Sequence, residues 1–131
     1  MRPMMNAEFE LAVCDLLNAA RKMRDPELNK VEGEPRIWTS VEQMQSFWLR
    51  REERRTLRVA ALERAQKRAK IVADALPMSG WVTCGGWAVA RTWVGHDEHP
   101  AVVLAPPDWA RAHMPGTEGL PDDVLLVWTS S

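Results

Sequence analysis

The chain of 131 residues contains no tyrosine, only two phenylalanines and only two cysteines. Cys14 and Cys84 are too few for a disulfide framework, and both stand among apolar residues, so we expect buried thiols in a reducing compartment. No run of about 18 apolar residues occurs, which argues against a membrane-spanning helix. The N-terminus lacks the apolar core and cleavage site of a secretory signal. These absences predict a cytoplasmic protein.

The chain also has little net charge, with a formal value of −1 at pH 7. The molecule as a whole therefore does not attract nucleic acid or an anionic membrane. Residues 41–76 hold nine Lys or Arg against five Asp or Glu, a net of +4, whereas residues 77–131 hold two against six, a net of −4. The basic stretch and the acidic C-terminal segment could neutralise each other inside the molecule.

Glycine and proline are missing from residues 41–76, where the good helix formers Ala, Arg, Leu, Glu and Lys dominate. Thr39 and Ser40 precede Glu42 and Gln43 at the spacing of capping boxes, which predicts the start of a helix. Unbroken, this helix would be about 54 Å long, whereas a compact chain of this length forms a globule roughly 36 Å across. The helix is therefore predicted either to break or to project and be covered by a partner.

Residues at three- and four-residue steps form one stripe along this helix. Its C-terminal half is apolar and predicts a packed seam, made of Leu62, Ala65, Ala69, Val72 and Leu76. The same spacing, continued backwards, meets Arg58, Arg55 and Arg51, and then Trp48 and Met44. The stripe is thus apolar at both ends and cationic in the middle.

The remainder of the chain predicts one more helix and a small sheet. Residues 6–24 carry an apolar face at helical spacing and end at Asp25-Pro26. Residues 80–94 alternate as strands around Gly85-Gly86, a two-residue hairpin signal that sets Val82 opposite Val89 and Cys84 opposite Trp87. Residues 101–105 and 124–129 read as further strands.

The predicted fold is accordingly α+β, with a single domain over residues 1–131. An N-terminal helix (6–24) and one long helix (41–76) precede a small antiparallel sheet of three to four strands within residues 80–129.

The candidate partner-binding site is an arginine cluster with a nearby tryptophan: Trp48, Arg50, Arg51, Arg54, Arg55 and Arg58. Guanidinium groups suit bidentate binding of carboxylates or phosphates. Three interpretations remain open. The cluster is a solvated face paired with the acidic C-terminal segment, or it binds an acidic protein surface, or it binds nucleic acid together with Arg64, Lys67, Arg68 and Lys70.

Seven tryptophans are more than so small a core encloses. We expect core positions for Trp87 and Trp93, because they alternate along a strand. Exposed tryptophan beside arginine is typical of interface hot spots, which favours Trp48. Stacking on single-stranded bases is the alternative use of exposed tryptophan.

His96 and His99, three residues apart, could ligate a metal with Cys84 or His113 as a third ligand. No second ligand pair of zinc-like spacing follows, so a polar solvated loop is the simpler interpretation. No nucleophile motif appears, and Gly85-Gly86 is too short for a phosphate-binding loop.

The function predicted from these observations is a non-enzymatic protein–protein interaction module without a cofactor or metal. Its basic helix would dock on the acidic surface of a protein partner or on a second copy of the chain, forming a dimer. Residue types with GC-rich codons (Trp, Arg, Ala) are abundant, which suggests a GC-rich prokaryote or its phage. A small phage- or mobile-element-encoded inhibitor of a host complex, of the anti-CRISPR type, fits this picture. The alternatives are a nucleic-acid-associated protein and a small metal-dependent enzyme at His96 and His99.

Overall fold

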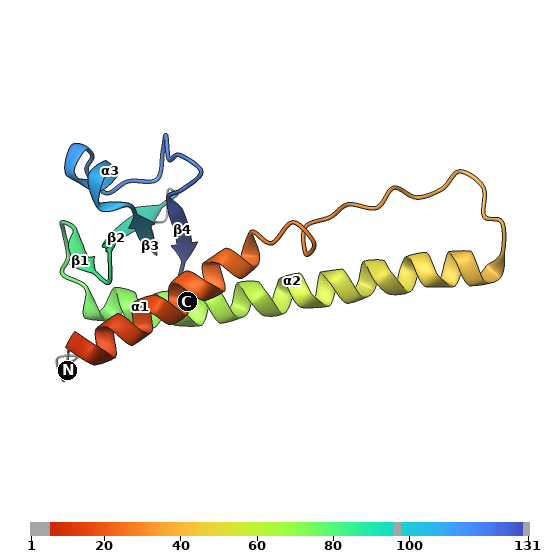
Figure 1. The fold of residues 1–131 in the computed structure, drawn as a ribbon, viewed down its shortest axis with the longest axis horizontal. Coiled ribbons are helices and arrows are strands. Elements are labelled where there is room, and N and C mark those ends of the chain that lie inside the picture. The colour runs from red at the N-terminus through yellow and green to blue at the C-terminus, as the bar shows by residue number, and fades with distance from the viewer. Residues whose placement is uncertain (1–5, 96–97, 130–131) are drawn as a thin grey trace.

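A computed structural model describes residues 6–95 and 98–129 of the chain. Its class is α+β, as predicted, with two helices before a four-stranded antiparallel sheet (Figure 1). The elements are α1 (Asn6–Met23), α2 (Val41–Ala75), β1 (Val82–Cys84), β2 (Trp87–Val94), β3 (His99–Ala105), α3 (Pro107–Ala112) and β4 (Leu125–Trp128).

The four strands pair with their neighbours along the chain, in the order β1-β2-β3-β4. The predicted hairpin register is confirmed, with Val82 opposite Val89 and Cys84 opposite Trp87. Gly85 and Gly86 between the two strands have φ values of 56° and 80°. Only glycine adopts such positive φ values without steric cost, which is why this pair can close a two-residue turn.

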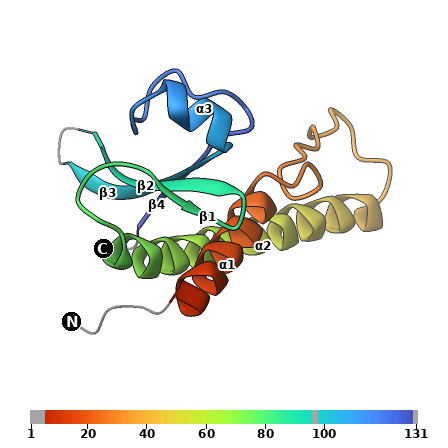
Figure 2. The ribbon, with the colours of Figure 1, turned by 60° about the vertical axis from the view of Figure 1, so that its left-hand side comes forward.

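The sheet lies between the pair of long helices and α3 (Figure 2). On the helix side, Leu16 and Val72 pack with strand residues such as Val89 and Leu104, and all four are fully buried. On the other side, Ala90 and Val103 pack beneath α3 in a smaller second cluster. These two clusters form the globular part of the molecule.

The long helix α2 is continuous, and its 35 residues span about 52 Å at ~1.5 Å per residue. The predicted cap is present, because the Ser40 hydroxyl accepts the Gln43 backbone N–H at 3.0 Å. The Gln43 side chain in turn accepts the Thr39 backbone N–H at 2.7 Å. The helix ends where Leu76 turns extended before Pro77, a residue that disfavours helix in its predecessor.

Three sequence expectations need correction. Both thiols were expected to be buried, but Cys14 is exposed and only Cys84 is buried. Leu62 is 41% exposed and does not belong to the packed seam, which begins only at Ala65. Trp93 is also exposed, at 37%, and the Arg91 guanidinium lies 5.8 Å from the centre of its ring. Trp87, in contrast, is partly buried against the main core as expected.

Candidate functional site

The N-terminal half of α2 projects far beyond the globular part of the molecule (Figure 1). Phe47 and Ala65 are buried, yet none of residues 48–64 between them is. We call residues 41–62 the projecting segment. Residues 24–40 connect the end of α1 to the start of α2. They run along the projecting segment out to its tip, and we call them the connecting loop.

The tip of the projecting segment is held by three aromatic rings. Phe47 is only 3% exposed, with the rings of Trp38 and Trp48 centred 5.3 Å and 5.1 Å from its own. Trp48 itself remains 42% exposed, and the Arg51 guanidinium lies 5.2 Å from its ring centre. Phe47 thus anchors the connecting loop, while Trp48 presents a large apolar surface to solvent.

Farther along the helix, one carboxylate in the connecting loop pairs with two arginines. Glu32 accepts bonds from Arg50 Nη2 at 2.7 Å and from Arg50 Nε at 3.1 Å, a bidentate geometry. Arg54 Nη1 also donates to Glu32, at 3.3 Å. The hydrogen bond from Arg50 is the largest influence that holds the pKa of the Glu32 carboxyl below its ordinary value. Arg58 completes the attachment by donating to the Leu28 carbonyl at 3.2 Å.

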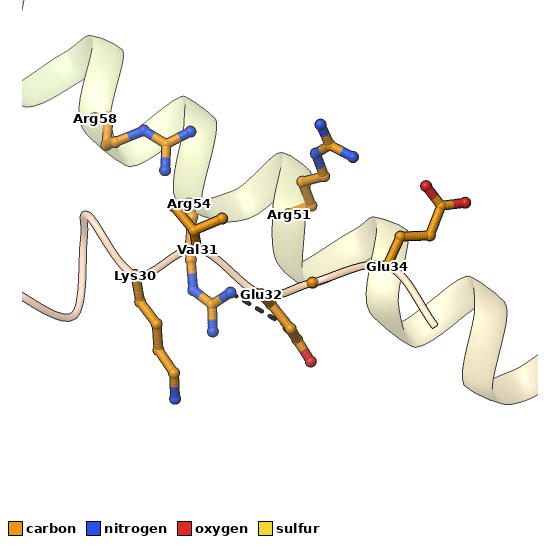
Figure 3. A pocket seen from close by; sticks show the side chains of 8 residues that line it. Lys30, Val31, Glu32, Glu34, Arg51, Arg54 and Arg58 are labelled. Atoms are coloured by element: carbon orange, nitrogen blue, oxygen red, sulfur yellow. Dashed lines mark hydrogen bonds and ion pairs between the residues drawn. The ribbon is translucent and has the colours of Figure 1, made fainter. Parts of the chain in front are cut away.

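A cleft of about 370 Å³ lies between the connecting loop and α2. Its walls carry four cations (Lys30, Arg51, Arg54 and Arg58) and two carboxylates (Glu32 and Glu34). Arg54 reaches Glu32, whereas the Arg51 guanidinium points away from that carboxylate (Figure 3). Among the described residues, Arg51 in the wall of this cleft forms no ion pair, whereas Glu32 already neutralises part of the positive charge.

The structure corrects the predicted source of neutralisation. The partner of Arg50 and Arg54 is Glu32 in the connecting loop, not the acidic C-terminal segment. The connecting loop, residues 24–40, holds three Lys or Arg against four Asp or Glu, a net of −1, and the projecting segment, residues 41–62, holds five against three, a net of +2. Loop and segment together carry a net charge of only +1, so the predicted cationic rod is less basic than its helix alone.

The candidate residues fall into two groups on the helix. Arg50, Arg54 and Arg58 hold the connecting loop. Among the residues that the structure describes, Arg51 and Arg55 form no ion pair, and together with Trp48 they are exposed. The structure therefore assigns roughly half of the predicted cluster to internal attachment and leaves the other half available.

Apolar side chains exposed along the projecting segment were missed by sequence reasoning. Val59 is 49% exposed, and the others are Val41, Leu49, Leu57 and Leu62. Their signal was weak, because Leu49 and Leu57 lie on other faces of the helix than Val41, Val59 and Leu62, and charged residues interrupt the shared face.

A second hollow, of about 510 Å³, lies beside α3 and is lined by Trp81, His113 and Met114, among others. The Trp81 indole donates to the His113 carbonyl at 2.8 Å, and His113 stacks on Trp109 with ring centres 4.2 Å apart. The hollow is therefore explained by packing around α3.

The residues suggested for a metal site do not come together. His99 Nε2 is bonded to the Thr129 carbonyl at 2.8 Å, Cys84 lies in the main core, and His113 stacks beside α3. His96 lies outside the described residues. In residues 6–95 and 98–129, no three His, Cys, Asp or Glu side chains are grouped so that they could hold a metal ion.

Comparison with known proteins adds no relative, because no family model, curated protein or solved structure matches the chain. Within the described ranges, no helix combines the length and the apolar character needed to cross a bilayer.

Proposed function

We propose that this protein is a non-enzymatic protein-binding module that docks on an acidic surface of a partner protein through its projecting segment. The observation that carries the proposal is a rod with no buried residue from 48 to 64 that exposes Trp48 beside Arg51. Exposed tryptophan and arginine are the residue types most enriched at the energetic centres of interfaces. Monomeric proteins seldom leave large apolar side chains grouped in solvent without a binding role.

The chemistry of the partner follows from the side chains that stay exposed on the segment. Trp48 requires an apolar recess, and Arg51 and Arg55 require carboxylates. A guanidinium already stacked on an indole ring is pre-ordered, so less side-chain entropy is lost when it pairs with a carboxylate. We infer an acidic partner surface with an apolar pocket within reach of the tip of α2.

Nucleic acid is less well supported as the partner. Glu32 and Glu34 line the same cleft as the arginines, and carboxylates there would repel phosphates. The net charge of only +1 on loop and segment together also provides little of the long-range attraction that nucleic-acid binding proteins use. If nucleic acid were bound, its affinity would fall steeply with salt, whereas a Trp48-anchored protein interface would respond much less.

The inhibitor role extends the same proposal. A projecting segment of 22 residues is about 33 Å long, so it can cover a functional surface of a larger complex while the globular part stays outside. The abundance of residue types with GC-rich codons favours a GC-rich prokaryote or its phage as the source, and a chain encoded by a phage or another mobile element would act against a host complex. The docking proposal stands independently of this extension.

The test is affinity purification of the tagged chain from cells of its source, with quantitative comparison of the proteins retained. The variant Arg51→Glu/Arg55→Glu should lose the specific partner, because it places acidic groups opposite an acidic surface. The matched control Arg64→Glu/Lys67→Glu changes charge equally on exposed positions of the globular half of α2. Circular dichroism should show that both variants stay folded. Retention of the same proteins by both variants would reject the projecting segment as the docking surface.

A further inference from the structure

One face of the projecting segment differs from the face that the connecting loop covers. The loop binds Phe47, Arg50, Arg54 and Arg58, which recur at three- and four-residue steps. A shift of one residue turns a helix by about 100°, so Trp48, Arg55 and Val59, which follow Phe47, Arg54 and Arg58, form a separate row, and Arg51, which follows Arg50, lies at its edge. We call this row, with its neighbours at the same spacing, the open stripe. It consists of Val41, Met44, Trp48, Glu52, Arg55, Val59 and Leu62.

Apolar and charged residues occupy different parts of the open stripe. Both of its ends are apolar, and every apolar member except Met44 is exposed. Its centre carries one carboxylate, Glu52, and one guanidinium, Arg55, and both are exposed. Neither forms an ion pair with any residue that the structure describes.

Two copies of the open stripe related by a twofold axis would complement each other in charge and in apolar surface. When a second helix is laid antiparallel with the axis between residues 53 and 54, Glu52 of each copy lies opposite Arg55 of the other. Trp48 then lies opposite Val59 of the second copy, and Met44 beside its Leu62. A contact that uses the same surface on both copies is the commonest way in which a closed dimer forms.

The parallel arrangement of two copies is disfavoured by the same residues. It would place Glu52 against Glu52 and Arg55 against Arg55, and like charges directly opposed are destabilising. The antiparallel arrangement also matches the length of the rod. Residue 41 of one copy would reach residue 66 of the other, next to Ala65, where burial in the globular part begins.

We infer that the open stripe binds a second copy of this chain, as an antiparallel dimer of projecting segments with reciprocal Glu52–Arg55 ion pairs. This inference rests on the proposed function, because it names one partner for the same projecting segment. A second copy supplies an apolar surface for Trp48 and a carboxylate for Arg55, two of the three contacts that the proposed function assigns to the segment. Helices packed in this way lie about 8–10 Å apart, which leaves the connecting loops on the outer sides of the pair.

The test is the mass in solution, measured by light scattering or sedimentation from about 1 µM to 1 mM, a range that spans the affinities of small transient interfaces. The wild-type chain should approach twice 14.9 kDa as concentration rises. Glu52→Arg and Arg55→Glu should each weaken dimerisation at least tenfold, because each variant places like charges opposite one another in both reciprocal contacts between residues 52 and 55. The exposed control Arg64→Glu should leave it unchanged.

Of two combinations of these variants, the mixture tests the charge pairing, and the double variant distinguishes the antiparallel dimer from a parallel one. A mixture of the Glu52→Arg and Arg55→Glu variants should dimerise, since every charge then meets its opposite. The double variant Glu52→Arg/Arg55→Glu should also recover the dimer by itself, which only the antiparallel register allows. A wild-type chain that stays at 14.9 kDa up to the highest concentration, or a double variant that fails to recover, would overturn the inference.

The two proposals fail in different ways. A monomeric protein whose Arg51→Glu/Arg55→Glu variant still loses a purified partner would reject the second copy but keep the docking function. A dimer unaffected by Glu52→Arg would mean that self-association uses another surface, and would reject the open stripe alone.

Discussion

Phe47 provides the most direct test of how the projecting segment is held together. It is the only buried residue of α2 before Ala65, and it packs between Trp38 and Trp48. Replacing a buried Phe by Ala in a well-packed core costs about 3–5 kcal/mol. Because only two rings surround Phe47 at the tip, we take the lower end, about 3 kcal/mol, for Phe47→Ala.

The loss should be local. None of residues 48–64 is buried, so no buried side chain of α2 connects the tip to the main core. The Phe47→Ala variant should therefore open the tip and release the connecting loop around Trp38, while the arginine contacts to Glu32 and Leu28 and the globular part stay in place. Partial opening of this kind is common where a segment has few buried contacts.

Hydrogen exchange followed by mass spectrometry measures this opening. A change of about 3 kcal/mol corresponds to roughly a hundredfold faster exchange, and we expect it for the amides near residues 41–50. The melting temperature of the globular part should stay nearly constant. Leu49→Ala, at an exposed position two residues away, is the matched control and should change neither quantity.

Leu16→Ala serves as the reference for loss of global stability, since Leu16 is fully buried in the main core. It should cost about 2–5 kcal/mol of global stability and lower the melting temperature. If Phe47→Ala lowered the melting temperature as much as Leu16→Ala, the tip and the globular part would unfold as one unit, and local opening of the tip would be refuted.

Two further predictions concern titratable groups. The pKa of Glu32 is lowered, chiefly by the hydrogen bond that Arg50 donates to it. Glu32 therefore contributes fully to holding the connecting loop above the ordinary glutamate pKa of about 4.3. This contribution is lost as pH falls through the lowered pKa. In the wild type, hydrogen exchange of residues 30–34 should rise over that acidic range. In the Glu32→Gln variant it should already be raised at pH 7. Equal exchange-against-pH profiles for the two proteins would contradict the ion pair. Burial raises the pKa of the Cys84 thiol, whereas Cys14 is exposed. A maleimide at pH 8 should therefore label Cys14 rapidly and Cys84 only after denaturant is added, and rapid labelling of both would contradict the packing of β1.

Local features of the fold were predictable, because each depends on residues close together in the chain. The capping boxes around Thr39 and Ser40 located the start of α2 to the residue. The Gly85-Gly86 pair set the hairpin register without knowledge of any other element. The apolar steps of residues 6–24 identified α1, and only its last residue differs from the structure.

The site was predictable only in part. Arginine spacing and the nearby Trp48 indicated a region of α2 that lies in the projecting segment, and the length of the helix indicated that it would either break or project. The exposed Val59 and Leu62 were not identified, because a seam that is packed at Ala65 gives no sign in the sequence of where packing stops. Burial depends on how far α1 and the sheet extend along α2, and that extent is a property of the assembled molecule.

The sequence by itself determined a long stretch of helix formers, its cap, a tight hairpin and the position of an arginine-rich stretch, whereas the structure decided that the helix is continuous. Propensity, capping and turn geometry act over a few residues and need no tertiary contact. Tertiary structure alone decided which carboxylate neutralises the arginines and which face of the helix stays open. Glu32 meets Arg50 across 18 residues of chain, and their approach depends on the path of the connecting loop, which is held at the tip by the packing of Trp38 on Phe47.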